Sequence, residues 1–247
     1  MSHTVVFLGP TLPAGVARRL LAADYRGPAR CGDVLRAVLD GAAVIGLIDG
    51  YFHDVPAVWH KEILFALERQ VVVFGAASMG ALRAAELAPF GMIGVGRIAA
   101  AFRSGCLTDD DEVAVRHGPA ELGFPLLSEP LVNIRATVAR AVRQGVLPAS
   151  VAPCLVELAK QTFYPERCWA RLLAQARGHG LEMGSFAGWL LRGRVDAKAI
   201  DARLLLRALA RHDHASTGPR PGFRMAHTEM WDSLMERVRR EPERARP

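Results

Sequence analysis

The stretch Gln70–Leu87 constrains the fold more than any other part of this chain. It opens with the apolar, mainly β-branched run Val71–Phe74, which is typical of a buried strand. The small residues Gly75–Ser78 follow, and Met79–Leu87 then reads as a helix. A strand that turns sharply into a helix, with a serine at the corner, is the layout of a nucleophile elbow.

Ser78 therefore has two interpretations. As a nucleophile it would stand among small neighbours that let a substrate approach, and the N–H groups at the start of the helix could bind a developing negative charge. As an ordinary residue it would only cap the helix in a common strand-to-helix turn. The stretch by itself leaves both interpretations open.

The neighbouring segments predict an α/β fold. The apolar run Ala42–Ile48 has the pattern of a buried parallel strand, and a helix is expected from Asp54-Val55-Pro56 to Leu67, before the Val71 strand. A further strand is expected at Thr4–Leu8. We expect a central, mainly parallel sheet with flanking helices in the N-terminal part, followed by an all-helical C-terminal part.

The same reading divides the chain into three regions. Residues 1–145 form the expected α/β core, residues 146–215 a helical region, and residues 216–247 a basic, partly disordered tail with one short helix at Glu229–Arg239. The distribution of charge also divides the chain. Residues 1–129 carry 11 basic and 14 acidic residues, whereas residues 130–247 carry 20 basic and 11 acidic residues. A basic half indicates an acidic partner or a solvated arginine-rich surface.

Composition excludes several classes of protein. The chain has 247 residues, of which 51% are hydrophobic and 23% charged, and no apolar run approaches the length of a membrane-spanning helix. The start of the sequence has no signal-peptide pattern. Its four cysteines are far apart, which predicts reduced thiols in a cytoplasmic protein without a metal site. No nucleic-acid-binding motif is present, and we expect neither a membrane nor a nucleic-acid partner.

Lys61 is the best candidate for a base that activates Ser78. Only three of the 31 basic residues are lysines, and a lysine, unlike an arginine, can lose its proton. Its helical neighbours three and four positions away are all apolar, which would partly desolvate the ammonium and favour its neutral form. A serine–lysine pair is a known variant of the catalytic triad. The alternative is a lysine that extends along the edge of its helix into solvent.

Other candidate site residues have weaker support from the sequence. Asp49 follows a predicted parallel strand, at the sheet edge where ligands gather, although Asp-Gly is also simply a good turn. Arg83 is a candidate substrate-binding residue, or it pairs with Glu86 three positions later. Gly94–Ala99 matches part of a dinucleotide-binding pattern, and Asp109–Glu112 could hold Mg²⁺ or form a solvated helix start.

Five segments together resemble the core of the TfuA family. They are GLIDGYFHDVPAVWHKEILFAL, VFGAASMGALRAAEL, FGMIGVGRI, DDDEVAVRHGP and SEPLVNIRATV, in the family's order and spanning roughly residues 45 to 140. The opening VVFLGPTL resembles the family's N-terminal start.

The resemblance implies a function. TfuA-like proteins accompany YcaO enzymes, which use ATP to activate peptide backbone amides, and the two together make thioamides in ribosomally synthesised peptides. Family members resemble hydrolases that use a Ser-Lys pair to cleave the C-terminal thiocarboxylate of a ThiS-like sulfur-carrier protein and so release sulfide. They also help YcaO to bind its precursor peptide. The resemblance implies no cofactor.

On this sequence the family's catalytic serine falls on Ser78 and its lysine on Lys61. The oxyanion would be held by N–H groups near Met79 and Gly80, and the small residues Gly75 and Ala77 would line a groove for the carrier's tail. The alternative expectation is an adaptor without catalysis, which brings YcaO, sulfur carrier and peptide together through the basic C-terminal half. A nucleotide-binding protein that uses the Gly94 region is a third hypothesis.

Overall fold

The structure is a computed structural model that describes residues 3–53, 55–212 and 222–240. The chain divides into two compact units. Unit 1 combines residues 1–108 with residues 199–247, and unit 2 is residues 109–198. The regions expected from composition, 1–145, 146–215 and 216–247, use other boundaries and stay a prediction.

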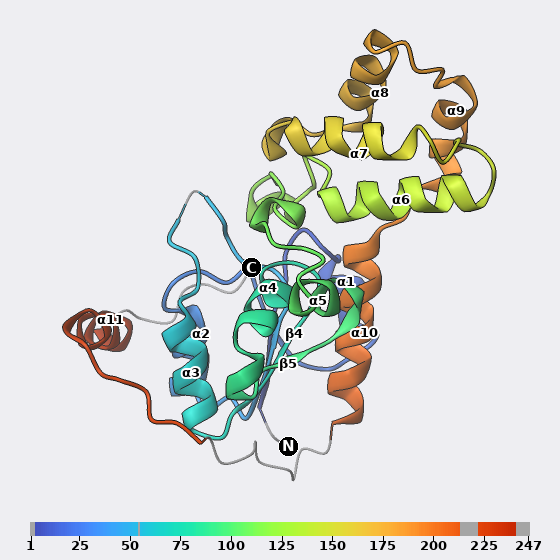
Figure 1. The fold of residues 1–247 in the computed structure, drawn as a ribbon. Coiled ribbons are helices and arrows are strands. Elements are labelled where there is room, and N and C mark those ends of the chain that lie inside the picture. Colours follow the sequence, from blue (N-terminus) through green and yellow to red (C-terminus); the bar gives the residue numbers. More distant parts are fainter. Residues whose placement is uncertain (1–2, 54, 213–221, 241–247) are drawn as a thin grey trace. The chain divides into compact units, whose positions relative to one another are not determined.

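Unit 1 is built on a five-stranded sheet whose strands are all parallel (Figure 1). The strand order is β2-β1-β3-β4-β5. The strands are β1 (Thr4–Phe7), β2 (Asp24–Arg26), β3 (Val44–Leu47), β4 (Val72–Gly75) and β5 (Ile93–Gly94). This is one of the two common orders of doubly wound α/β folds, in which ligands bind beyond the carboxyl ends of the strands, where the order reverses. Here the reversal lies between β1 and β3.

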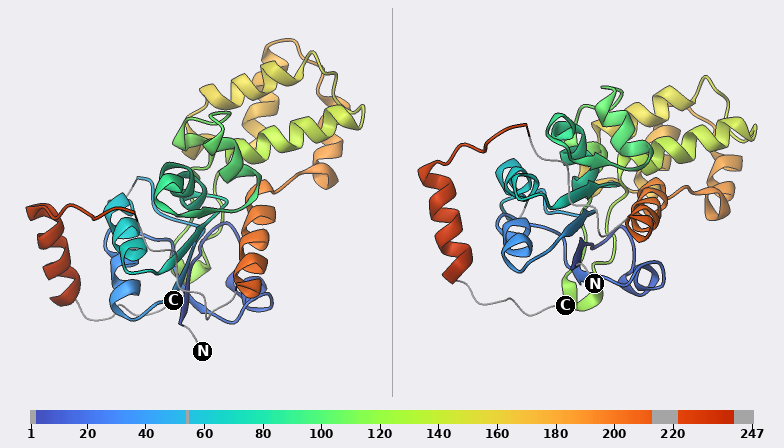
Figure 2. Two further views of the ribbon diagram at one scale, coloured as in Figure 1. Left: turned by 60° about the horizontal axis from the view of Figure 1, so that its bottom comes forward. Right: turned by 90° about the horizontal axis from the view of Figure 1, so that it is seen from below.

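Helices cover both faces of this sheet (Figure 2). They are α1 (Ala14–Arg18), α2 (Asp33–Leu39), α3 (His60–Glu68), α4 (Met79–Glu86), α5 (Gly96–Arg103), α10 (Ala197–Arg211) and α11 (Glu229–Arg240), with the 3₁₀ turn η1 (Ala88–Phe90). Successive side chains along each strand point to opposite faces of the sheet. Val5, Ile45 and Val73 point toward α2, α3 and α11, whereas Val6 and Val72 point toward α1 and α10.

Helix α10 lies close over the middle of the sheet because β3 has a glycine there. A Cβ atom at Gly46 would lie 2.8 Å from the Leu209 side chain. Ala202, Leu205 and Leu206 are fully buried on the same sheet face. A helix from late in the sequence therefore completes the core of the N-terminal sheet.

Unit 2 is helical and has its own core. Its elements are η2 (Asp110–Glu112), η3 (Ala120–Leu122), α6 (Leu131–Arg143), α7 (Ala152–Gln161), η4 (Tyr164–Glu166), α8 (Trp169–Gly178) and α9 (Gly184–Gly193). Leu131, Ile134, Leu155 and Leu172 are buried together in this core. The expected fold class, a mainly parallel sheet with flanking helices followed by a helical C-terminal part, is confirmed.

Several predicted bounds were wrong. The helix expected from Asp54 begins only at His60, because residues 56 and 57 pair with the segment after β2: Cys31 N–H donates to Pro56 O at 2.8 Å, and Arg30 forms an antiparallel bridge with Ala57. The short strands β2 and β5 were missed. The helix predicted at Glu229–Arg239 is confirmed as α11. The disorder expected at the very end of the tail concerns residues 241–247, which lie outside the described residues.

Candidate functional site

The corner between β4 and α4 is a strained turn. Ala77 has φ +66°, and the N–H of Ser78 donates to Ala76 O at 2.8 Å, which closes a γ-turn around Ala77. A turn with a positive φ at its central residue is rare, and a non-glycine residue held there costs about 1–3 kcal/mol. Such strain persists only where the surrounding structure fixes it, and it is concentrated at functional sites.

Two glycines press the start of α4 against the sheet and so fix this turn. A Cβ atom at Gly80 would lie 1.8 Å from Leu47 O, and one at Gly75 would lie 2.1 Å from Gly80 O. No side chain fits at either position without moving backbone. Gly75, Gly80 and Ala77 are buried, so their observed role is close helix–sheet packing.

Ser78 occupies the N-cap position of α4, but its side chain does not cap the helix. The residue is 2% exposed. A serine at an N-cap usually accepts a hydrogen bond from one of the first helical N–H groups. The capping interpretation thus describes the position of Ser78 and not the use of its hydroxyl group.

The two backbone donors expected for an oxyanion differ in availability. The Gly80 N–H donates to Ile48 O at 3.2 Å and is therefore already used by the sheet. The Met79 N–H has no acceptor among the described residues. Of the predicted pair, only the N–H of Met79 is available to a developing negative charge next to Ser78.

Asp49 lies at the same edge of the sheet but has a structural role. Its carboxylate accepts hydrogen bonds from the N–H groups of Gly9 and Thr11 at 2.9 and 3.1 Å, and from the Thr11 hydroxyl at 2.5 Å. The residue is 1% exposed. Asp49 thus ties the loop after β1 to the end of β3, at the point where the strand order reverses.

Lys61 lies in the first turn of α3 and contacts the C-terminal segment. Its Nζ donates to Ala226 O at 2.8 Å and to the Thr228 hydroxyl at 3.0 Å. No hydrogen bond joins Lys61 to Ser78 among the described residues. Helix α4 meets the start of α3 through Arg83 and Glu86, which lie one to two turns beyond Ser78.

Those contacts line a cavity of about 480 Å³ in unit 1. Its walls are Pro56, Ala57, Val58, Trp59, His60, Lys61, Arg83, Thr228 and Met230. Arg83 donates from Nε to Val58 O at 3.3 Å and from Nη1 to Glu86 at 2.7 Å, and His60 contacts the same carboxylate at 2.8 Å. The expected pairing of Arg83 with Glu86 is confirmed. The structure therefore brings Lys61 together with Arg83, whereas Ser78 does not line this cavity.

Sequence reasoning missed Trp59, His60 and Thr228 as neighbours of Lys61. Trp59 and His60 adjoin it in sequence and could have been found from its position at the start of a helix. Thr228 is 167 residues away, and no local signal connects the two.

Glu62, next to Lys61, is fully buried and joins two helices. One carboxylate oxygen accepts the N–H groups of Gly32 and Leu35 at the start of α2, at 2.9 and 3.2 Å. The other accepts the Trp59 N–H at 3.0 Å. Burial raises the pKa of Glu62 to about 7, although these three hydrogen bonds oppose the shift. Glu62 thus acts as a cap for α2 that is supplied by α3.

The dinucleotide-like pattern at Gly94–Ala99 does follow a short strand and open a helix, as a nucleotide site would. The start of that helix is filled by the protein itself. The Asp201 carboxylate accepts the Ile98 N–H at 2.8 Å, and a Cβ atom at Gly96 would lie 2.3 Å from this carboxylate. A phosphate would have to displace a buried aspartate.

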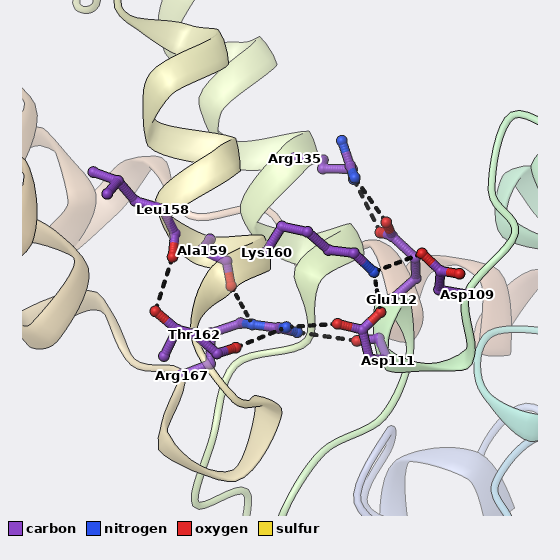
Figure 3. A network of polar contacts seen from close by, with 9 residues as sticks. All are labelled: Asp109, Asp111, Glu112, Arg135, Leu158, Ala159, Lys160, Thr162 and Arg167. Atoms are coloured by element: carbon purple, nitrogen blue, oxygen red, sulfur yellow. Dashed lines mark hydrogen bonds and ion pairs between the residues drawn. The ribbon is translucent and has the colours of Figure 1, made fainter.

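Three carboxylates of the acidic run in unit 2, those of Asp109, Asp111 and Glu112, pair with basic side chains (Figure 3). Lys160 pairs with both Asp109 and Asp111. Arg167, 1% exposed, donates to the carboxylate and carbonyl of Asp111 and to two carbonyls at the end of α7. Arg135 forms a two-pronged contact with Glu112. This network anchors the loop, and no cluster suited to a metal ion occurs in the described part of the chain.

A parallel sheet with helices on both faces and a strained serine corner at its carboxyl edge defines a doubly wound α/β protein with a candidate nucleophile. The sequence model of the TfuA-like protein family matches residues 49–168, so this part of the chain is similar to TfuA-like proteins. The family resemblance seen in the sequence is thereby confirmed. No curated protein matches the chain. None of the described helices has both the length and the apolar character to cross a bilayer.

Proposed function

We propose that this protein works with a YcaO enzyme in the thioamidation of a peptide backbone. In this proposal it hydrolyses the C-terminal thiocarboxylate of a ThiS-like sulfur-carrier protein and so supplies sulfide. The family match supports the association with YcaO. Ser78 is the proposed nucleophile and Lys61 the proposed base.

The unused hydroxyl group of Ser78 carries the proposal. It stands after a strained residue, at the carboxyl edge of a parallel sheet, and it makes no capping hydrogen bond. The adjacent Met79 N–H has no acceptor among the described residues, and such a donor can stabilise an oxyanion that forms beside Ser78.

The reaction needs two steps. Ser78 Oγ attacks the thiocarboxylate carbon while its proton passes to the Lys61 amine, and the Met79 N–H binds the oxyanion. The intermediate collapses to an ester on Ser78, the sulfide leaves as HS⁻ with the proton that Lys61 held, and water then hydrolyses the ester to the carboxylate and free Ser78. For the first step, Lys61 must leave Ala226 and Thr228, which hold its ammonium group in this structure.

Rates of sulfide release from a thiocarboxylated carrier test this mechanism. Ser78→Ala should abolish release, and Lys61→Arg should lower it about 10²–10⁴-fold, because arginine keeps the charge but cannot accept the proton. The exposed Ser104 provides a matched control, and Ser104→Ala should release sulfide at the normal rate. Normal rates in both Ser78→Ala and Lys61→Arg would contradict the mechanism.

A non-catalytic adaptor is the second candidate. It is favoured by the position of Lys61, which is bonded to the C-terminal segment and not to Ser78. As an adaptor, the chain would bring YcaO, sulfur carrier and precursor peptide together. Thioamidation would then proceed normally with Ser78→Ala, and assembly of the complex would weaken as salt is added.

A further inference from the structure

The C-terminal strap, which we define as residues 222–240 including α11, lies along α2 and α3 (Figures 1 and 2). Trp231, Leu234 and Val238 hold it there and are buried in the same cluster as the two helices. The Trp231 ring packs on Phe65 with 5.2 Å between ring centres. The strap is therefore a defined part of unit 1.

The start of the strap binds the ammonium group of Lys61. Two of the three N–H donors of an ammonium group can be assigned here, one to Ala226 O at 2.8 Å and one to the Thr228 hydroxyl at 3.0 Å. The same hydroxyl accepts the Trp231 N–H at 3.4 Å, so Thr228 caps α11 while it holds Lys61. The strap and the lysine are thus linked through one side chain.

The strap also forms a wall of the cavity. Thr228 and Met230 line it together with Lys61 and Arg83. Glu86 pairs with Arg83 and His60 from outside the lining, whereas the ammonium group of Lys61 is held by the strap. Movement of the strap would widen the cavity and release Lys61 at the same time.

We propose that the C-terminal strap is an autoinhibitory segment, which binds the ammonium group of Lys61 and holds it away from Ser78 until the strap is displaced. This inference rests on the proposed function, because it assumes that Lys61 acts at Ser78. It accounts for the absence, among the described residues, of a hydrogen bond between the two.

Several features make the strap displaceable. Residues 222–228 form no regular secondary structure, and Met225 N–H is held by one acceptor, the Glu68 carboxylate, at 3.0 Å. The buried Trp231 indole N–H has no acceptor among the described residues. A buried N–H donor without an acceptor costs free energy, and this cost cancels part of the stabilisation that comes from burying the Trp231 ring. Met230, one of the lining residues of the cavity, is 67% exposed.

The first test measures how fast Lys61 is modified in the full chain. Formaldehyde with a borohydride reductant methylates amines, and peptide mass spectrometry separates Lys61 from Lys160 and Lys198. Thr228→Val removes one acceptor and should raise the rate at Lys61 about fivefold, the factor that corresponds to one ordinary hydrogen bond. Thr228→Ser keeps the hydroxyl and should restore the slow rate.

Glu68→Ala gives an independent variant, since it frees Met225 without touching Lys61 or its partners. It should also raise the rate at Lys61. Thermal unfolding of each variant checks that unit 1 stays folded, and the buried Lys198, which belongs to unit 2, reports on opening there. Unchanged Lys61 rates in both Thr228→Val and Glu68→Ala would overturn the proposal.

Measuring the rate of sulfide release tells a failure of the autoinhibition proposal apart from a failure of the proposed hydrolase function. Faster release by Glu68→Ala, together with faster methylation of Lys61, supports both. Faster methylation with no sulfide release by any variant or by the unmodified protein would show that the strap binds Lys61 and that hydrolysis is not the activity. Faster methylation with unchanged sulfide release would overturn autoinhibition alone.

Discussion

At the scale of single residues, neighbouring side chains decide what each polar group does. Ser78 and Asp49 both follow strands that end at one edge of the sheet. The Asp49 carboxylate is fully used by the loop after β1, whereas the Ser78 hydroxyl makes no capping bond. The sequence pattern made both residues candidates for the site. Only their hydrogen-bond partners show that Asp49 has a structural role and that the Ser78 side chain does not cap its helix.

Glu62 should make the stability of unit 1 depend on pH. Its folded-state pKa is about 7, raised by burial from the ordinary 4.5. Below pH 4.5 the group is protonated in both the folded and the unfolded state. Between pH 4.5 and about 7 the unfolded state loses the proton first, so the free energy of unfolding should fall, by about 3 kcal/mol in all.

Urea unfolding from pH 4 to pH 8 checks this expectation. Glu62→Gln should flatten the decline between pH 4.5 and 7, because an amide does not titrate. It should also cost about 1–3 kcal/mol at low pH, since the amide nitrogen cannot accept the Trp59 N–H. Glu182→Gln, at an exposed site, should leave the profile unchanged. An unaltered decline in Glu62→Gln would rule out Glu62 as its source.

At the scale of elements, the site depends on how closely α4 approaches the sheet. Gly75 and Gly80 remove the side chains that would keep the helix away, and the strained turn at Ala77 follows from that approach. The sequence showed small residues around a serine and suggested a groove for a substrate. The structure uses the same residues for backbone packing.

Gly80→Ala should therefore destabilise the protein by about 3 kcal/mol, the range for forced overpacking, because its Cβ would meet Leu47 O. Gly15→Ala provides the matched control, since no atom lies within 4 Å of a Cβ there. It should be neutral or up to about 1 kcal/mol more stable. Thermal unfolding of the two variants gives the comparison. Equal stabilities would show that α4 can move from the sheet without cost.

At the scale of the whole molecule, unit 1 is discontinuous in sequence. Its strands all lie before residue 109, but α11 and nearly all of α10 come from the second part of unit 1, residues 199–247, and cover the two faces. The helical region expected from composition is thus distributed between two units. Contacts over such long sequence separations leave no local pattern.

A fragment of residues 1–145 should consequently fail to fold. It would lack α10 and α11, and Val6, Val72 and Phe74 would lose the helix that buries them. Circular dichroism should show no cooperative thermal transition in the fragment, whereas the full chain should show one. A cooperative transition in the fragment would mean that the N-terminal sheet is stable without its late helices.

The sequence by itself determined the three longer parallel strands β1, β3 and β4, most of the helices, the serine corner and the family resemblance, because periodicity, turn residues and long family segments are local signals. Only the tertiary structure decided the roles of Glu62 and Asp201, the start of α3 at His60, and the pairing of Lys61 with Thr228. Those features depend on which distant backbone atoms meet a side chain. A hydrogen bond between residues 167 positions apart is set by packing alone.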